Sequence, residues 1–361
     1  MPRTVLAYRG SREVKLKGIL AMAAVILVWG VTFVNTRALL FDFSALEIQI
    51  LRFAMAWAAL CAVEKLKGKK LKLRVEVEEL MSERPRNIFH FSFSIFHSLK
   101  DELLFAGMGL CGVFIYQLLE NCAIYYTNAS NVAILVSFGP VVTAVMARWA
   151  GRDGHAGRMP LQLWLGSAVA IAGVALISFN NAVTFELRPL GDLMALAAML
   201  SWGCYSILID KANAKGYPPL TAIRKAFGWA LVMMIPLGLW GVTESGYTAL
   251  DGSFSITLDA AANAARFREP MNWINLGFLG LLASAACFVL WNVACKAFGV
   301  VRTTIGLYFT PIVGVLFAAA FLGERVTGMS VAGGVLIIAG VAVTRGKWKM
   351  KNGKWKMENE K

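Results

Sequence analysis

The stretch LCGVFIYQLLENCAIYYTNASNVAILVSFGPVVTAVMARW, from Leu110 to Trp149, decides how the rest of the chain is interpreted. Its length and polarity predict two bilayer-spanning helices joined by a tight turn at YYTNAS, with Pro140 in the middle of the second helix. A second copy follows as GLLASAACFVLWNVACKAFGVVRTTIGLYFTPIVGVLFAAAFLG. In this copy Asn292 matches Asn121 and Pro311 matches Pro140 at the same offset. The chain is therefore predicted to be a duplication.

The composition indicates a polytopic membrane protein. A hydrophobic fraction of 58% over 361 residues and a mean hydropathy of +0.60 do not belong to a water-soluble chain. Apolar runs long enough to cross a bilayer predict an all-α membrane protein with ten transmembrane helices. These ten segments are residues 18–39, 44–64, 103–126, 130–149, 161–179, 190–209, 220–241, 272–295, 303–322 and 329–344.

The duplication sets the expected topology. Trp29-Gly30 in the first segment matches Trp202-Gly203 in the sixth, so each repeat holds five helices. Because five is odd, the second copy enters the membrane from the opposite side, and the two halves form inverted repeats. The predicted divisions are a cytoplasmic N-tail at 1–17, a first repeat at 18–179 with a long cytoplasmic insertion at 65–102, a second repeat at 190–344, and a basic cytoplasmic tail at 345–361.

The distribution of charge tests this topology. With a cytoplasmic N-terminus, 30 of the 36 Lys and Arg residues fall in segments on the cytoplasmic side. This positive-inside bias predicts a multi-pass protein of the cytoplasmic (inner) membrane with both termini in the cytoplasm. The net charge of +14 then marks orientation and contact of the basic tails with anionic lipid, and it does not indicate a nucleic-acid partner. The insertion ends in FHFSFSIFHSL, which is either an interfacial segment or a partner-docking site.

The residues suggest no metal site, no cofactor and no enzyme. All six cysteines fall in apolar stretches without a C-x-x-C spacing, and the three histidines are scattered among polar or mixed connections. The predicted spans hold neither a cluster of His and carboxylate residues nor a nucleophile motif.

Several motifs carry a family resemblance. They are the Trp-Gly pair in the first helix of each half, Arg52-Phe53 in the second helix, YTNASNV at 126–132 ahead of Pro140, and LGER at 322–325. With ten spans in two halves, the chain resembles the EamA family of the drug/metabolite transporter superfamily over roughly residues 18–345. It departs from the family at ARWAGRDGHAGR, where a Glu is usual, and in its long insertion. The resemblance implies a metabolite carrier that works by alternating access, often an exporter of amino acids or related small molecules.

Two ionisable residues inside predicted spans are the first site candidates. Lipid-facing charge costs about 2.5 to 3.5 kcal/mol on the insertion scale, so Glu120 and Arg52 are predicted to face a cavity. Both are expected roughly 9 to 12 Å below the outer ends of their helices, which allows an ion pair. Two interpretations stay open. The pair pins two helices together, or Arg52 holds a substrate carboxylate while Glu120 exchanges a proton or holds an ammonium group.

The paired prolines and several polar or aromatic residues are further candidates. Pro140 and Pro311 each remove a backbone donor in mid-helix, which favours a hinge or pathway-lining role over simple kinks. Other residues could line the substrate or ion pathway, with packing between helices as the alternative for each one: Gln117, Asn121, Asn131, Asn292, Tyr116, Tyr308 and Trp29.

The sequence thus predicts a secondary transporter that moves a small metabolite, an amino acid or a related compound, with export favoured and protons as a candidate coupling ion. Efflux of small organic cations or drugs is the closest alternative. A passive solute channel, or a receptor or scaffold that docks through 65–102, belongs to a different class. Composition does not distinguish one oligomeric state from another.

Overall fold

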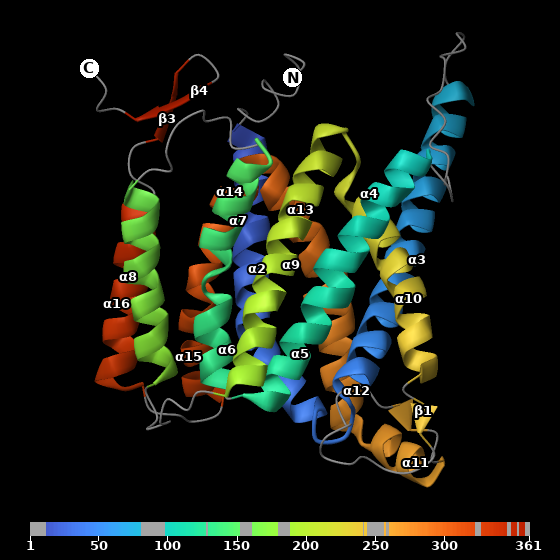
Figure 1. Ribbon diagram of the computed structural model, residues 1–361. Coiled ribbons are helices and arrows are strands. Elements are labelled where there is room, and N and C mark those ends of the chain that lie inside the picture. Colours follow the sequence, from blue (N-terminus) through green and yellow to red (C-terminus); the bar gives the residue numbers. More distant parts are fainter. Residues whose placement is uncertain are drawn as a thin grey trace.

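The computed structural model is a bundle of upright helices (Figure 1). Helix α2 (Arg12–Leu39) begins and α16 (Gly328–Thr344) ends at the same face of the bundle, which we name the upper face. The opposite face is named the lower face. The structure describes residues 12–80, 98–127, 129–151, 161–179, 188–240, 242–243, 256–257, 260–321, 326–344, 348–351 and 354–357.

The first half of the chain continues from α2 through α3 (Ala45–Leu80), α4 (Leu99–Gly109), η1 (Leu110–Ile115), α5 (Tyr116–Tyr126), α6 (Ala129–Val136), α7 (Gly139–Trp149) and α8 (Leu161–Ser178). Segment η1 is π-helical and continuous with α4 and α5, so the three form one span. Helix α3 has 36 residues and is about 54 Å long at about 1.5 Å per residue. It therefore projects beyond the bundle at the upper face (Figure 1), and the predicted insertion begins as a continuation of this helix.

The second half contains α9 (Pro189–Ala214), α10 (Pro219–Trp240), α11 (Ala260–Arg268), α12 (Pro270–Gly277), η2 (Phe278–Ala286), α13 (Cys287–Phe298), α14 (Val300–Ile305), η3 (Gly306–Phe309), α15 (Thr310–Phe321) and α16. Segment η2 is π-helical, like η1, and precedes the second copy of the Asn-x-Ala sequence. Two short strand pairs complete the described chain: parallel β1 (Val242–Thr243) with β2 (Ile256–Thr257), and antiparallel β3 (Trp348–Lys351) with β4 (Lys354–Met357).

The described residues contain nine helices that are long and apolar enough to cross a bilayer. The chain is thus a multi-pass, helical membrane protein, as the composition predicts. The tenth predicted segment forms α16, which is apolar but has only 17 residues. Its length of about 26 Å falls slightly short of a hydrocarbon core of about 30 Å.

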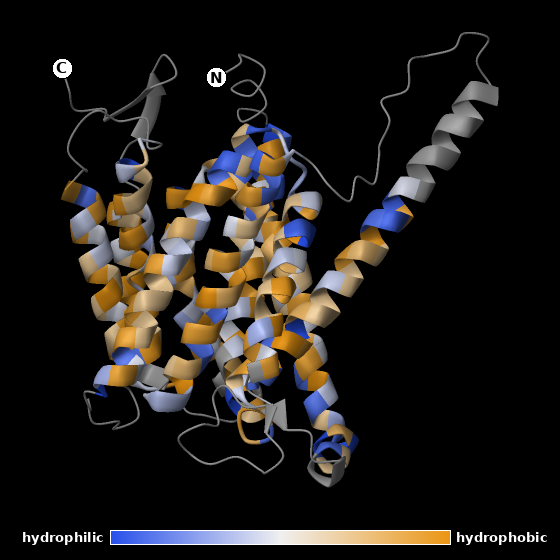
Figure 2. Cartoon of the chain, turned by 45° about the vertical axis from the view of Figure 1, so that its right-hand side comes forward, coloured by the Kyte–Doolittle hydropathy of each residue, from blue (hydrophilic) through white to orange (hydrophobic). Residues whose placement is uncertain are grey.

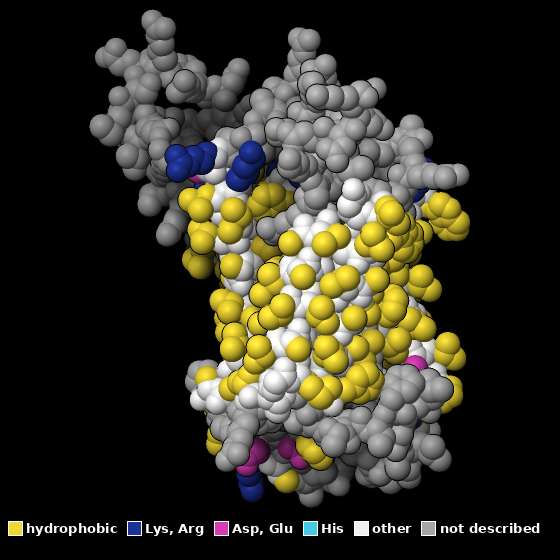
Figure 3. All heavy atoms as spheres, turned by 90° about the vertical axis from the view of Figure 1, so that its left-hand side faces the viewer, with side chains coloured by type: hydrophobic (Ala, Val, Ile, Leu, Met, Phe, Trp, Pro, Cys, Tyr) yellow, Lys and Arg dark blue, Asp and Glu magenta, His cyan; other side chains and the backbone are white. Residues whose placement is uncertain are grey.

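Apolar side chains cover the outside of the bundle between its faces. On α9, Leu193, Leu196 and Leu200 are exposed at helical spacing, and Val331 and Val335 are exposed on α16. Figure 2 shows a hydrophobic band between more hydrophilic ends. In Figure 3 hydrophobic side chains cover the middle of one face, and the visible Lys and Arg side chains lie mostly toward the upper end. Such continuous apolar surface is suited to lipid rather than to water.

Four glycines bring α8 and α16 into backbone contact at one edge of the bundle (Figure 1). A Cβ atom added to Gly173 would lie 2.5 Å from the carbonyl oxygen of Gly333, and one added to Gly333 would lie 2.6 Å from that of Gly173. Gly166 and Gly340 form the same reciprocal contact at 2.6 and 2.5 Å. Close approach of this kind requires small residues, because a larger side chain would clash with the backbone of the other helix. In lipid, where the hydrophobic effect does not drive helices together, such close packing stabilises their association.

Replacing Gly173 by alanine is expected to destabilise the protein by about 1–3 kcal/mol. The added methyl group would clash with backbone atoms of α16, which cannot move away as a flexible side chain could. Gly334→Ala is the matched control, since a Cβ atom there meets nothing within 4 Å. Thermal unfolding in detergent would show the difference. Equal midpoints for the two variants would contradict this account of the α8–α16 contact.

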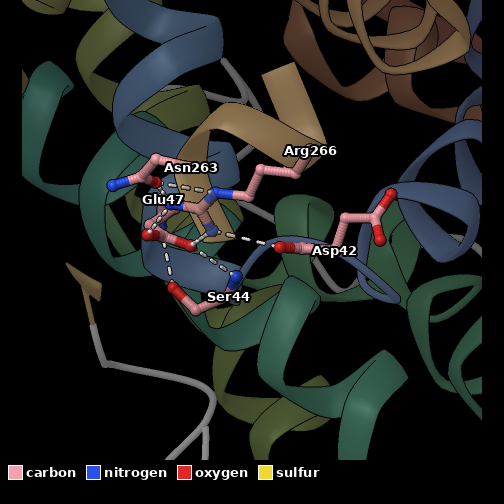
Figure 4. Close-up of polar contacts among 5 residues, drawn as sticks. All are labelled: Asp42, Ser44, Glu47, Asn263 and Arg266. Atoms are coloured by element: carbon pink, nitrogen blue, oxygen red, sulfur yellow. Dashed lines mark hydrogen bonds and ion pairs between the residues drawn. The ribbon is translucent and has the colours of Figure 1, made fainter. Parts of the chain in front are cut away.

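A buried ion pair at the lower face fixes where α3 begins (Figure 4). Arg266 of α11 donates to both carboxylate oxygens of Glu47, at 2.7 and 2.9 Å, and to the backbone oxygen of Asp42 at 3.1 Å. The backbone N–H of Glu47 donates to Ser44 Oγ, and that of Ser44 donates to Glu47 Oε2, which forms a capping box. These residues, together with Asn263, are named the lower clamp. Together they hold the first turn of α3 against α11.

Candidate functional site

A cavity of about 430 Å³ lies in the lower part of the bundle. Its wall includes Thr36 near the end of α2, Ser178 at the end of α8 and Ser330 near the start of α16. All three positions are near the lower face, whereas Trp202 and Phe288 lie midway along their spans. The cavity therefore extends from the middle of the bundle toward the lower face.

Aromatic rings form the inner end of this cavity. Trp29 and Trp202, which occupy equivalent positions in the two repeats, pack edge to face with ring centroids 5.8 Å apart. Tyr116 packs on Trp202 at 4.9 Å, and Phe288 packs on Trp29 at 5.7 Å. We name these four residues the aromatic floor. Because the rings present their faces and edges to the cavity, the floor can receive an apolar side chain or a cationic group.

Glu120 is the acidic group of the cavity. Tyr116 donates its hydroxyl hydrogen to Glu120 Oε1 at 2.6 Å, and Gln117 donates from Nε2 to Oε2 at 2.8 Å. Tyr116 and Gln117 are adjacent in the first turn of α5, Glu120 lies one turn further along, and all three line the cavity. Both oxygens of the carboxylate are thus held in place, while the side chain stays only partly buried and reachable from the cavity.

Arg52 is the basic group of the cavity. It is buried, and it lies about 7.5 Å further along α3 than Glu47 of the lower clamp. Its Nε donates to Ser284 Oγ in η2 at 3.0 Å. Within the described part of the chain, Arg52 and Glu120 form no ion pair within 4.0 Å. The ion pair that the sequence allowed is therefore not made in this structure, because Arg52 is held by the second repeat instead.

The cavity brings together many of the residues that the sequence predicted. Its wall includes Trp29, Arg52, Tyr116, Gln117, Glu120, Tyr308, Pro140 and Pro311. These residues come from α2, α3, α5, α7, η3 and α15, so both repeats contribute to one site.

Three predicted residues, Asn121, Asn131 and Asn292, do not line the cavity. Asn121 donates to the backbone oxygen of Ala45 at 3.4 Å and ties α5 to α3. Asn131 donates to Asp192 Oδ1 at 3.3 Å and so connects α6 to the start of α9. Asn292 is fully buried in α13. The first two thus make the contacts between helices that the alternative interpretation expected.

The prolines do not stand in mid-helix, as the sequence suggested. Pro140 lies in the first turn of α7, after a turn that separates α6 from α7. Pro311 is the second residue of α15, directly after the 3-10 segment η3. A proline is accommodated in the first turn of a helix because its missing N–H would have no partner there. Each span is therefore interrupted before its proline, and both interruptions lie beside the cavity.

Sequence reasoning missed Trp202, Phe288 and Ser284 as site residues. Trp202 could have been found from the repeat, because it is the equivalent of Trp29. Phe288 and Ser284 carry no motif, and only the packing of η2 and α13 against α3 brings them to the site. Among the described residues, no group of three or more His, Cys, Asp or Glu side chains lies close enough together to hold a metal ion.

Comparisons with known proteins agree with this arrangement. The model of the EamA-like transporter family matches twice, over residues 16–179 and 189–346, which is once in each half. A "Probable amino-acid metabolite efflux pump" of Escherichia coli is 25% identical over 328 residues, covering 90% of this chain and 93% of its own.

Two further proteins are similar. A "Probable terminal-alkyne amino-acid exporter" of Streptantibioticus cattleyicolor is 29% identical over 243 residues, which cover 67% of this chain and 72% of its own. A crystal structure described only as that of a protein shares the fold, with a TM-score of 0.63 at 15% identity, over 91% of this chain and 96% of that one. Since the family model covers both halves, the chain belongs to the EamA-like transporter family.

Proposed function

We propose that this membrane transporter exports amino acids with apolar side chains by alternating access. One observation supports the proposal. A single cavity is lined by a buried guanidinium group (Arg52), an accessible carboxylate (Glu120) and the aromatic floor. A zwitterion matches this set, because Arg52 binds its carboxylate, Glu120 binds its ammonium group and the floor packs against its side chain. The names of the efflux pump and the exporter among the relatives support export and this class of solute.

The proposed architecture is ten transmembrane helices in two inverted repeats of five, over 18–179 and 190–344. The reciprocal glycine contacts support it. Gly166 and Gly173 are the repeat equivalents of Gly333 and Gly340, and the contact of Gly166 with Gly340 corresponds to that of Gly333 with Gly173. A twofold axis between α8 and α16 would relate the two contacts. The interruptions before Pro140 and Pro311 are the proposed hinges of the rocking motion.

The proposed orientation places the upper face in the cytoplasm. The distribution of Lys and Arg along the chain supports it, as do the basic side chains near the upper end in Figure 3. Both termini are then cytoplasmic in the inner membrane, and the cavity faces the extracytoplasmic side. The basic N-tail and C-terminal tail are proposed to contact anionic lipid. Residues 1–11 of the N-tail, 81–97 of the insertion and parts of 345–361 lie outside the described residues.

Counterflow in proteoliposomes tests the proposed function. Vesicles that contain the purified protein are loaded with an unlabelled solute, and the uptake of labelled phenylalanine, leucine and tetraethylammonium is followed at two pH values. Saturable exchange of the amino acids is expected, with a dependence on pH if protons couple through Glu120. Uptake that rises linearly with concentration would indicate a channel. Uptake of tetraethylammonium with no exchange of either amino acid would indicate efflux of organic cations.

A further inference from the structure

Three hydrogen-bond donors lie unpaired directly behind the aromatic floor. They are Nε1 of Trp202, the hydroxyl of Tyr205 and Nε1 of Trp291, and within the described part of the chain none has a hydrogen-bond partner. All three side chains are buried, with 3%, 0% and 0% of their surface exposed. The ring centroids of Tyr205 and Trp291 lie 5.2 and 5.3 Å from that of Trp202, so the three side chains that carry these donors pack in one cluster. We name it the donor cluster.

The repeat-equivalent tryptophan shows that this lack of partners is not a general property of the fold. Trp29 donates from Nε1 to the backbone oxygen of Ala283 at 2.9 Å. Trp202, which packs against Trp29, has no such acceptor. Leaving a buried donor unpaired destabilises a protein, so three unpaired donors on rings that pack together call for an explanation. The donor cluster is therefore a candidate for a partner that comes from outside the chain.

The donor cluster lies on the upper side of the floor. Tyr205 is about 4.5 Å closer than Trp202 to the upper end of α9, and Trp291 lies about 10 Å from the upper end of α13. Trp202 lines the cavity, but Tyr205 and Trp291 are not among its lining residues. A solute that passed from the upper face to the cavity would meet Tyr205 and Trp291 first.

Two buried ion pairs join α3 and α4 to the first two turns of α10, on the upper side of the bundle. Glu64 of α3 pairs with Arg224 of α10, and Glu102 of α4 pairs with Lys225 of α10. Each pair joins a helix of the first repeat to α10 of the second. Because desolvation offsets much of the attraction in a buried pair, such pairs can separate when water enters, without a large change in free energy. The ion pairs are thus contacts of the upper side that can open, together with the apolar side chains packed between them and the donor cluster.

We propose that the donor cluster is a second binding site for the substrate carboxylate, reached from the upper face when the two ion pairs separate. The chemistry of the cluster selects this group. Two indole N–H groups and a phenol O–H offer donors, and a carboxylate is an acceptor with two oxygens. The substrate carboxylate binds there first and then passes to Arg52 once the cavity faces the lower side. This inference rests on the proposed function and adds the site at which export begins.

The test removes single donors. Tyr205→Phe deletes only the hydroxyl and keeps the ring, whereas Trp291→Phe deletes the indole N–H together with part of the ring. Tyr125→Phe is the matched control, because Tyr125 is exposed at the lower end of α5. Each variant is assayed by counterflow with two pairs of labelled probes: phenylalanine with phenethylamine, and leucine with isoamylamine. Within each pair the two probes differ only in the carboxylate.

The expected result is a loss of roughly 10-fold or more in kcat/KM for the amino acids in Tyr205→Phe and Trp291→Phe, since each variant loses a hydrogen bond to a charged group. Exchange of the amines is expected to stay at the wild-type ratio. The thermal midpoint of Tyr205→Phe is expected to stay equal or rise, whereas that of Trp291→Phe falls because the smaller ring leaves a cavity. Equal losses for amino acids and amines would show a packing defect and overturn the inference, as would unchanged kcat/KM for both. A wild-type protein that exchanges neither amino acid would instead contradict the proposed function.

Discussion

Replacing Glu120 by glutamine is expected to reduce exchange of amino acids roughly 10- to 100-fold, because a hydrogen bond to a charged ammonium group is lost. The variant should fold normally. Glutamine has the shape of glutamate: its single oxygen accepts one of the two hydrogen bonds that Tyr116 and Gln117 now donate, and its NH2 group can donate to the oxygen of the other residue. Counterflow of labelled phenylalanine measures the effect. If Glu120 also exchanges a proton, the dependence of exchange on pH should disappear in this variant.

The same measurement on Arg52→Met distinguishes the role of the Arg52 cation from that of the Glu120 carboxylate. Arg52 is held by Ser284 and not by Glu120, so neutralising either residue leaves the other in its present contacts. Arg52→Met is expected to abolish exchange of amino acids while sparing an amine such as phenethylamine, which needs no cation. Glu13→Gln, which neutralises an exposed carboxylate near the start of α2, is the control. Wild-type exchange by both Glu120→Gln and Arg52→Met would show that these residues only stabilise the fold.

The spans could be predicted from the sequence because a bilayer requires long apolar helices. The duplication could be predicted because motifs of the first half recur in the second. About 20 apolar residues are needed to cross the hydrocarbon core, so the helices are visible as apolar runs. Arg52 and Glu120 could be predicted to face a cavity for a related reason, because a charged side chain at membrane depth is excluded from lipid. The family model matches once in each half of the chain, which agrees with the predicted duplication.

The partners of these residues could not be predicted, for two physical reasons. Ser284 lies 232 residues from Arg52, and its position depends on how η2 packs against α3. In addition, η1 and η2 are π-helical, which changes the direction of every side chain that follows them. Asn121 and Asn292 lie six residues beyond the ends of these segments, so a regular α-helical pattern that runs through the segments does not give the face on which they lie. Asn131 lies away from the cavity wall because its amide N–H donates a hydrogen bond to Asp192.

The lower clamp shows the same division between local and distant information. Ser44 and Glu47 have the Ser-x-x-Glu spacing of a capping box, which depends only on neighbouring residues. The residue that neutralises Glu47 is Arg266, 219 positions further along the chain, in a connection without a recognisable motif. Arg266 is also one of the few basic residues outside the proposed cytoplasmic segments. Its position departs from the general distribution of charge because it has a specific acidic partner.

Arg266→Met is expected to lower the free energy of unfolding by about 3–5 kcal/mol, the largest stability effect predicted for this protein. The side chains of Arg266 and Glu47 are only 8% and 5% exposed, so removing the guanidinium leaves a carboxylate buried with the capping contacts alone. Thermal or denaturant unfolding in detergent would measure the change. Lys17→Met removes the cation of the exposed Glu13–Lys17 pair and should leave stability nearly unchanged, because water screens such a pair.

The double variant Glu47→Gln/Arg266→Met distinguishes an unpaired charge from lost packing. Glutamine keeps an oxygen for the N–H of Ser44 but carries no charge that needs the guanidinium. If an uncompensated charge causes the loss, the double variant should be more stable than Arg266→Met alone, despite carrying one more substitution. Additive losses would mean that Arg266 acts mainly through its stacking on Phe43, whose ring centroid lies 4.6 Å from the guanidinium carbon. In either case the start of α3 should loosen, and exchange should fall together with stability, because the same helix carries Arg52 into the cavity.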